Sequence, residues 1–346
     1  MIPTESYRQR ITWIINQQCN FHCEYCTQWH NNAEVLKPID INRLYQGISS
    51  LKGDWQFHIT GGEPFLEKNF INICQEITQK HFLSLATNLS TKNVFDFADK
   101  IDPGKVVFIL TAVHITEREK NDKDLGKFIE KIVGLQNNGF NIVAYYVAHP
   151  SLFSRIKSDI EYIKSKGVQK IWIKVFNGWY EKKMYPDAFT QEQKFFLESM
   201  EADYLEIEIL NRPHKYHGQL CLTGQRHFLM DRNGNLKRCH STLKSYGNFF
   251  HKSIWIDDKP SPCPKKKCFA CPYEGIENIL TGRGNFFTVM KEDIIEQSLL
   301  FKRDGFMKRS QQILVDMYHS LSGPQINEKT SGGHKSQNQH LVSDKT

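Results

Sequence analysis

The sequence RITWIINQQCNFHCEYC, residues 10–26, joins a β-strand pattern to a group of thiols. Arg10–Asn16 is rich in β-branched and aromatic residues, which predicts a strand. Cys19, Cys23 and Cys26 follow at C-x3-C-x2-C spacing, just beyond the point where that strand should end. Thiolates are the usual ligands of iron–sulfur clusters, so this strand is expected to carry a metal site at one end.

Further segments of the same character predict five more strands, at Trp55–Thr60, Phe82–Ala86, Val106–Thr111, Asn141–Ala148 and Lys170–Val175. Between them the apolar residues recur at helical spacing, as in Glu67–Lys80. Six strands that alternate with helices predict an α/β fold with a parallel sheet and right-handed crossovers.

Polar and glycine-rich segments follow the first four predicted strands. The cysteine loop follows the first, Gly61-Gly62-Glu63-Pro64 the second, Thr87-Asn88 the third, and Thr111 the fourth. Ligands of parallel α/β sheets bind at the carboxyl ends of the strands, so we expect these segments to line one edge. His114 and His149 fall on the same edge, where packing or surface roles are the simpler interpretation.

The pattern changes in the second half of the chain. A helical segment is followed by Leu205–Leu210, which we interpret as a short strand. Asn233-Gly234 separates the predicted strand His227–Asp231 from a strand that ends at Cys239. Asn-Gly between apolar strands is a strong hairpin signal, and this hairpin would bring Cys239 back towards Cys221.

The bulk composition suggests a soluble, cytoplasmic protein with no membrane partner. The 346 residues carry a net charge of +7, interpreted as a solvated basic surface, with an anionic partner as the alternative. The N-terminus lacks the apolar core of a signal peptide, and no apolar run could span a bilayer. In a reducing compartment, the clustering of eight of the nine cysteines favours bound metal over disulfides.

The cysteine loop resembles the signature of the radical S-adenosylmethionine (SAM) superfamily, C-x3-C-x-aromatic-C, with Tyr25 as the aromatic residue. The resemblance implies a partial (β/α)6 TIM-like barrel over residues 1–176. It also implies that the three thiolates hold a [4Fe–4S] cluster whose fourth iron binds SAM, with Tyr25 near the adenine. A three-cysteine zinc site is the alternative.

The same resemblance implies further SAM contacts. Gly61-Gly62-Glu63-Pro64 matches the GGEP segment that contacts the SAM amino group in the family. Thr87 and Asn88 stand where the family often has a Thr-Asn-Gly turn, but Leu89 replaces the glycine here. Thr111 ends the fourth strand, where a polar residue often contacts the ribose. An ordinary hydrogen-bonded hydroxyl is an equally good interpretation of Thr87 and Thr111.

The C-terminal cysteines resemble the SPASM and twitch domains that follow the barrel in many radical SAM enzymes. Their number suggests a twitch-like domain with one auxiliary [4Fe–4S] cluster, held by Cys221, Cys239, Cys268 and Cys271. Cys263 competes for a place among these ligands. A structural zinc site is the alternative, because four cysteines with a C-x2-C pair also fit tetrahedral zinc.

The expected division of the chain is a radical SAM core over 1–176, a connecting helix and strand over 177–215, a twitch-like domain over 216–284, C-terminal helices over 285–321 and a disordered tail over 322–346. The tail prediction rests on its content of Gly, Ser, Gln, Asn and Lys.

By resemblance, the chain is an iron–sulfur oxidoreductase. A flavodoxin- or ferredoxin-type donor would supply the electron that cleaves SAM to a 5′-deoxyadenosyl radical, which takes hydrogen from the substrate. A small, sugar-like metabolite is favoured, because no peptide-recognition domain precedes the first strand. Modification of a peptide is the main alternative. A zinc-stabilised nucleic-acid-binding module is a more remote one.

Overall fold

The computed structural model describes residues 9–26, 32, 36–120, 124–200, 204–211, 217–218 and 220–266. All of them belong to one compact unit. The helices predicted within 285–321, the tail 322–346, Cys268 and Cys271 lie outside the described residues. Within the described part of the chain, no helix combines the length and the apolar character needed to cross a bilayer.

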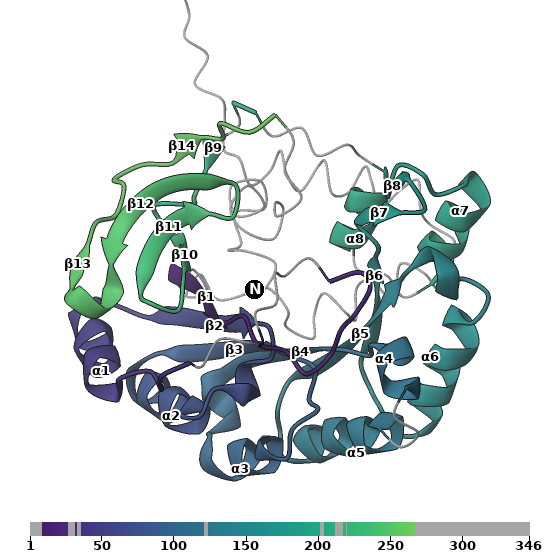
Figure 1. The fold of residues 1–346 in the computed structure, drawn as a ribbon, viewed down its shortest axis with the longest axis horizontal. Coiled ribbons are helices and arrows are strands. Elements are labelled where there is room, and N and C mark those ends of the chain that lie inside the picture. Colours follow the sequence, from purple (N-terminus) through teal and green to yellow (C-terminus); the bar gives the residue numbers. More distant parts are fainter. Residues whose placement is uncertain are drawn as a thin grey trace, which may run out of the picture. The chain divides into compact units, whose positions relative to one another are not determined.

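Six parallel strands form the centre of the sheet: β1 (Gln9–Asn16), β2 (Trp55–Gly61), β3 (Phe82–Thr87), β4 (Val106–Ala112), β5 (Ile142–Ala148) and β6 (Ile171–Val175). They pair in chain order, each parallel to the next (Figure 1). This confirms the predicted parallel α/β sheet and the partial (β/α)6 arrangement.

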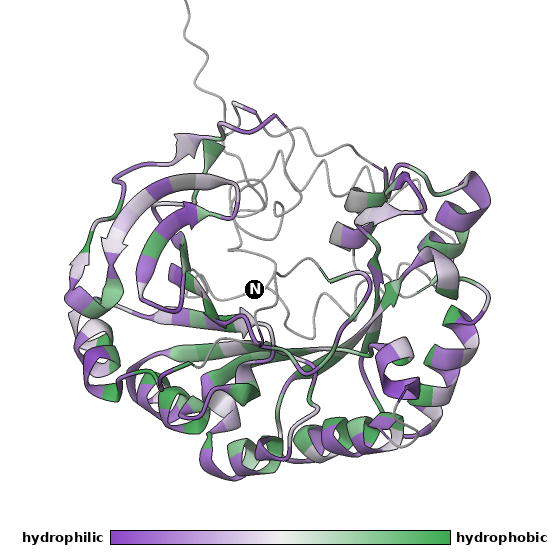
Figure 2. Ribbon diagram, in the orientation of Figure 1, coloured by the Kyte–Doolittle hydropathy of each residue, from purple (hydrophilic) through white to green (hydrophobic). Residues whose placement is uncertain are grey.

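The helices between these strands lie along the outer side of the curved sheet (Figure 1). They are α1 (Ile41–Ser50), α2 (Phe70–Lys80), α3 (Asn93–Lys100), α4 (Ile115–Glu119), α5 (Asp124–Asn137) and α6 (Ile156–Ser165). Short 3-10 turns add η2 (Pro64–Leu66), η3 (Pro103–Lys105) and η4 (Pro150–Leu152). Figure 2 shows hydrophilic and hydrophobic residues side by side on these helices, as expected where one face is buried.

Alternation along the strands separates an apolar face from a polar one. In β1, Ile11, Trp13 and Ile15 belong to the buried core beneath the helices, whereas Arg10 and Thr12 take the alternate positions. The buried polar residues on the strands around β1 include Arg10, Thr12, Gln56, His58, Ser84 and His227. Several bond to one another across strands, including Thr12 with His227 at 3.0 Å and His58 with Ser84 at 3.0 Å. The inner face of the sheet is therefore polar near β1.

The second half of the chain extends the same sheet. β10 (His227–Met230) pairs in parallel with β1, and β11 (Asn235–Cys239), β12 (Thr242–Asn248) and β13 (Ser253–Ile254) follow it, antiparallel to one another, to give a ten-stranded sheet. The predicted Asn-Gly hairpin is thus confirmed between β10 and β11. A 3-10 turn, η5 (Phe249–His251), joins β12 to β13.

Smaller elements complete the described part. β7 (Gly178–Tyr180) and β8 (Lys183–Tyr185) form a hairpin after β6, followed by α7 (Gln191–Ser199). β9 (Leu220–Cys221) pairs with β14 (Ser261–Pro262), and each strand is only two residues long.

The predicted strand Leu205–Leu210 is wrong, because this segment lies in α8 (Tyr204–Asn211). Alternating apolar and acidic residues resemble a half-buried strand in sequence. In the structure, however, Glu206 and Leu210 are both buried, at the i, i+4 spacing of one helix face. The Glu206 carboxylate accepts a hydrogen bond from the Val175 amide at 2.7 Å, so its burial is compensated at the end of β6.

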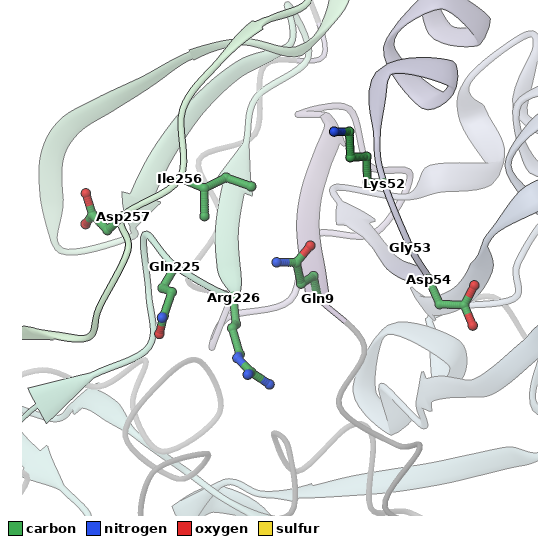
Figure 3. Close-up of a pocket in the computed structure, with 8 residues that line it drawn as sticks. All are labelled: Gln9, Lys52, Gly53, Asp54, Gln225, Arg226, Ile256 and Asp257. Carbon is green, nitrogen blue, oxygen red and sulfur yellow. The ribbon is translucent and has the colours of Figure 1, made fainter.

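A cavity of about 400 Å³ lies at the amino ends of β1, β2 and β10 (Figure 3). Its lining comprises Gln9, Lys52, Gly53, Asp54, Gln225, Arg226, Ile256 and Asp257. None of the residues predicted to bind a cofactor or metal belongs to this lining, and the cysteine loop follows the opposite end of β1.

Candidate functional site

The cysteine loop is fixed at the carboxyl end of β1 by a close backbone crossing with the end of β2. The amide of Gly62 donates to the Asn16 carbonyl at 3.0 Å, and that of Glu63 donates to the Gln18 carbonyl at 2.7 Å. A Cβ atom at Gly61 would lie 2.4 Å from the Asn16 oxygen, and one at Gly62 would lie 2.0 Å from the Gln18 oxygen. The two glycines are therefore required because the backbones touch.

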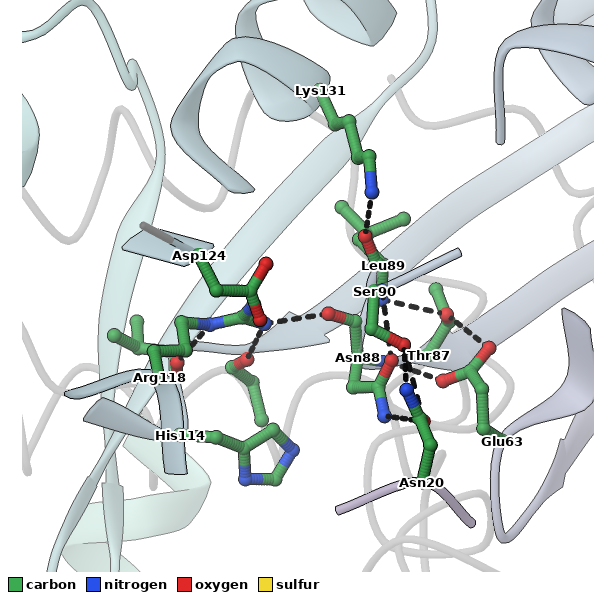
Figure 4. Close-up of polar contacts among 12 residues, drawn as sticks. Asn20, Glu63, Thr87, Asn88, Leu89, Ser90, His114, Arg118, Asp124 and Lys131 are labelled. Carbon is green, nitrogen blue, oxygen red and sulfur yellow. Dashed lines mark hydrogen bonds and ion pairs between the residues drawn. The ribbon is translucent and has the colours of Figure 1, made fainter. Parts of the chain in front are cut away.

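The Glu63 carboxylate is hydrogen-bonded to other residues inside the protein. It is fully buried and accepts hydrogen bonds from the Thr87 hydroxyl at 2.7 Å and the Asn88 amide at 2.6 Å (Figure 4). It also accepts a hydrogen bond from the Phe65 amide at 3.1 Å. Burial raises the pKa of Glu63, although these hydrogen bonds act in the opposite direction. This carboxylate therefore ties the end of β2 to the end of β3.

Leu89, which replaces the family's glycine, follows this tie in a left-handed backbone conformation with φ of 53°. Such a conformation costs an ordinary residue roughly 1–2 kcal/mol. Its side chain is 1% exposed, and its carbonyl accepts from Lys131 Nζ at 2.7 Å (Figure 4). Apolar burial and this hydrogen bond offset the backbone cost, which explains how leucine is accommodated.

Nitrogen donors surround the sulfur of Cys19. Asn88 Nδ2 lies 3.8 Å from Cys19 Sγ and 3.1 Å from Asn20 Oδ1. The Phe21 amide lies 3.4 Å from the same sulfur. The backbone of Cys19 is held by Asn32, whose Oδ1 accepts from the Cys19 amide at 2.9 Å and whose Nδ2 donates to the Cys19 carbonyl at 3.0 Å. These two nitrogen donors favour negative charge on the sulfur, whereas its burial acts in the opposite direction.

Arg118 supports the site from beneath. Its buried guanidinium donates through Nε to the Val113 carbonyl at 2.5 Å and through Nη2 to the Asn88 carbonyl at 2.5 Å (Figure 4). It also pairs with Asp124 at 3.1 Å and lies over the Phe128 ring at 3.8 Å. Burial lowers the pKa of Arg118 to about 10, which leaves it charged at neutral pH. Nothing in the sequence pattern separated this arginine from a solvent-exposed one.

His114 joins two residues of the cysteine loop. Its Nδ1 atom lies 3.1 Å from Cys23 Sγ and 3.0 Å from the Tyr25 hydroxyl. The rings of His114 and Tyr25 are stacked, with centroids 5.9 Å apart and planes inclined by 12°. Phe21 meets the His114 ring edge-on, and His149 meets the Tyr25 ring from another strand end. Burial lowers the pKa of His114 to about 3, so the ring is neutral.

Thr111 is brought beside Thr87 but not beside the cysteines. The two threonines are in register on adjacent strands, β4 and β3. Thr111 shares a face of β4 with Ile109, whose side chain belongs to the core beneath the helices. Within the described residues, the Thr111 hydroxyl is buried without a hydrogen-bond partner. The structure thus places it on the helix-facing side of the sheet.

Three C-terminal cysteines surround one small pocket of about 10 Å³. Cys221, Cys239 and Cys263 all line it, so the predicted return of Cys239 towards Cys221 is observed. Pairing of β9 with β14 sets Ser261 opposite Cys221, which carries Cys263 into the same pocket. Among the described residues, no three His, Cys, Asp or Glu side chains are grouped so as to hold a single metal ion.

Arg238 is the buried cation of this second site. It donates to Thr223 Oγ1 at 3.1 Å, to the Pro262 carbonyl at 3.1 Å and to the Ser261 carbonyl at 2.7 Å. Burial raises the pKa of Cys221, while its contact with Thr223 and the charge of Arg238 act in the opposite direction. Arg238 thus holds β14, and with it Cys263, against the pocket.

Comparison with known families assigns a domain to the first half of the chain. The model of the radical SAM superfamily matches residues 13–150, which include the cysteine loop and the ends of β2, β3 and β4. Residues 13–150 therefore correspond to a radical SAM domain.

Curated relatives match a short part of the chain. The chain is 32% identical over 95 residues to a GTP 3′,8-cyclase of Haemophilus ducreyi, a match of 24% of this chain and 28% of that protein. It is 39% identical over 69 residues to a GTP 3′,8-cyclase of Haemophilus influenzae, 18% of this chain and 20% of that protein. The matches thus span under a third of the length of these relatives.

Solved structures share the fold of the radical SAM domain. Native anSMEcpe with bound AdoMet superposes with a TM-score of 0.52 at 15% identity, covering 90% of this chain and 99% of that one. Streptococcus suis SuiB bound to S-adenosylmethionine gives a TM-score of 0.50 at 13% identity, covering 73% and 66%. At such low sequence identity, the structural similarity establishes the fold alone.

The thiols of the radical SAM domain fit the cluster that this family carries. Cys19 is buried, Cys23 half-buried and Cys26 exposed, so the loop presents its sulfurs from the protein interior outwards. Burial raises the pKa of Cys19 to about 11 and that of Cys23 to about 12. Both thiols are therefore protonated until iron displaces their protons. The nitrogen donors around Cys19 and Cys23 would then stabilise the resulting thiolates.

Proposed function

We propose that this chain cleaves SAM reductively and uses the product to remove a hydrogen atom from a substrate. The observation that carries the proposal is the backbone crossing that locks the three-cysteine loop to Gly61 and Gly62. When bound, the cluster supplies one electron to SAM. The protein's own task is to hold the thiols and the SAM-binding edge in one fixed arrangement.

Each predicted residue then has a distinct task. Cys19, Cys23 and Cys26 would bind three irons and leave the fourth for the amino and carboxylate groups of SAM. The Glu63 carboxylate already accepts three protein hydrogen bonds, so we assign contact with the SAM amino group to backbone atoms of residues 61–64. Tyr25, stacked on His114, would lie beside the adenine.

Thr87 and Asn88 are proposed to act mainly through the protein. The Thr87 hydroxyl and the Asn88 amide hold the Glu63 carboxylate, and the Asn88 side chain reaches Cys19. Both residues would therefore keep the loop and the GGEP segment in register. Thr111 would reach a ribose only through a rearrangement of β4, because it shares the helix-facing side with Ile109.

For the substrate we propose a small polar metabolite. Local similarity to proteins named GTP 3′,8-cyclase favours a nucleotide-like compound. The buried polar face of β1, which includes Arg10 and Thr12, would provide hydrogen-bonding groups in a low-dielectric interior. A peptide is the second candidate, because SuiB, a structural neighbour, was solved with a precursor peptide.

We further propose an auxiliary [4Fe–4S] cluster at the pocket of Cys221, Cys239 and Cys263, completed by a cysteine beyond the described residues. Three cysteines around one pocket are what a cluster or a structural metal would need. An electron donor of the flavodoxin or ferredoxin type would serve the N-terminal cluster.

Anaerobic reconstitution tests the main proposal. We expect about eight irons per chain if both clusters form, and release of 5′-deoxyadenosine on addition of dithionite and SAM. Cys23→Ala should abolish that product. Cys74→Ala is the matched control, because Cys74 is a fully buried thiol on α2 outside the loop. The proposal is wrong if Cys23→Ala still cleaves SAM, or if the loop takes up no iron.

The substrate class is tested with the same enzyme. Stimulation of 5′-deoxyadenosine release by GTP or a nucleotide sugar, with incorporation of substrate deuterium, would support the small-molecule proposal. Stimulation by peptides alone would contradict it.

A further inference from the structure

His114 is held rigidly at the end of β4. Its backbone is left-handed, with φ of 47° and ψ of 48°, and it forms the N-cap of α4. Its carbonyl accepts from the Glu117 amide at 3.0 Å and the Arg118 amide at 3.1 Å. The Glu117 carboxylate accepts from the His22 amide at 3.1 Å, so α4 is also tied to the cysteine loop. His114 is therefore anchored on both sides of its contact with Cys23.

The protonation of His114 follows from what Cys23 becomes when it binds iron. A ligating thiolate has no proton and can only accept a hydrogen bond. Nδ1 lies 3.1 Å from that sulfur, so an unprotonated Nδ1 would face a negative sulfur with a lone pair. The contact is favourable when the Nδ1 atom carries the proton of the neutral ring. The Tyr25 hydroxyl, 3.0 Å from Nδ1, then shares this N–H as a second acceptor.

We propose that His114 is a positioning residue whose Nδ1–H donates to Cys23 Sγ, holding the N-terminal cluster at a higher reduction potential and fixing the Tyr25 ring beside it. This inference rests on the proposed cluster at the three-cysteine loop. Hydrogen bonds to ligand sulfurs are among the features that set iron–sulfur potentials. They favour the reduced cluster because it carries more negative charge.

Three variants separate the side chain from the backbone. His114→Gly keeps the left-handed backbone but removes the donor. His114→Asn tolerates the same backbone and keeps a short N–H donor. His22→Asn makes the same chemical change in the cysteine loop at an exposed side chain, and is the matched control. Far-UV circular dichroism and iron content would be measured for each variant.

The main readout is the midpoint potential of the N-terminal cluster, followed by electron paramagnetic resonance in a Cys239→Ala background. At a fixed solution potential, we expect the ratio of reduced to oxidised N-terminal cluster to fall about threefold to tenfold in His114→Gly. The tenfold change corresponds to about 59 mV for one electron. His114→Asn should recover most of the shift, and His22→Asn should show none. An unchanged potential in His114→Gly would overturn the inference.

A wild-type measurement covers the case in which His114→Gly fails to retain iron. With 15N-histidine incorporated, pulsed resonance of the reduced cluster should show a coupled nitrogen that is lost in His114→Asn and retained in His22→Asn. Absence of that coupling in the wild type would contradict the hydrogen bond. Failure of the wild type to load the N-terminal cluster would instead contradict the proposed function.

Discussion

The two cysteine sites are built in opposite ways. The N-terminal loop is locked to β2 by a backbone crossing and supported by two buried charged side chains, Glu63 and Arg118. The C-terminal pocket depends on β9 and β14, which are two residues long, and on one buried arginine, Arg238. The parallel sheet therefore supplies the first site with a preformed scaffold, whereas the second relies more on whatever its thiols bind.

The largest contrast should appear in SAM cleavage. Cys23→Ala should reduce 5′-deoxyadenosine release by more than about 100-fold, because a proposed iron ligand is lost at the proposed site of SAM cleavage. Cys239→Ala should retain measurable release, because its pocket lies elsewhere on the sheet. Chromatographic measurement of 5′-deoxyadenosine checks both variants. Equal losses would show that the two sites do not act separately.

The two buried arginines should differ in their contribution to folding. Arg118→Met should lower the free energy of unfolding by about 3 kcal/mol, because Asp124 and two carbonyls lose their partner. Arg238→Met should cost about 1–2 kcal/mol, because Pro262 and Ser261 lie on a short, less buried strand. Urea denaturation of the metal-free proteins checks the order. A larger cost at Arg238 would reverse our view of which site is preformed.

The backbone crossing should be sensitive to a single methyl group. Gly62→Ala places a Cβ 2.0 Å from the Gln18 carbonyl oxygen, so the loop must move and iron retained at the N-terminal site should fall about tenfold. Gly126→Ala, on α5 with no atom within 4 Å of the added Cβ, should instead stabilise the fold by about 0.5–1 kcal/mol. Iron analysis and thermal denaturation compare the pair. Normal iron in Gly62→Ala would show that the crossing does not control the loop.

The smallest expected effect tests whether Cys263 is a ligand at the second cysteine site. If Cys263 binds the auxiliary cluster, Cys263→Ala should lose about half of the total iron and keep the N-terminal cluster signal. Cys74→Ala removes a buried thiol from α2 and should keep all of it. Unchanged iron in Cys263→Ala would favour Cys268 and Cys271 as the remaining ligands.

Sequence alone predicted the parts of the fold that depend on local pattern. The six strands, the Asn-Gly hairpin and the cysteine loop were found because period-two alternation, turn residues and thiol spacing are visible in one segment. The strand predicted at Leu205–Leu210 was wrong because alternating apolar and acidic residues imitate the pattern of a strand. In the structure, the buried Glu206 carboxylate accepts a hydrogen bond from an amide at the end of β6. That partner is distant in sequence.

The supporting residues of the site could not be found in the same way. Arg118 lies on a five-residue helix, and its partners come from the segments at the ends of β3 and β4 and from α5. The sequence placed His114 at the correct edge, but its contact with Cys23 depends on how β4 and the loop after β1 are positioned in space. Glu63 was expected to contribute to SAM binding through a carboxylate or a carbonyl oxygen, and its carboxylate is turned towards Thr87 and Asn88 by contacts that the sequence does not reveal.

The parallel pairing of β10 with β1 determines where the two cysteine sites lie along β1. Arg10 is level with His227, and Cys239 ends the antiparallel neighbour of β10 at that same height. One cysteine site therefore follows the carboxyl end of β1 and the other borders its amino end, separated by a strand of about 20 Å. A reactant lying along Arg10 and Thr12 would therefore lie between the two cysteine sites, with one site near each end of β1.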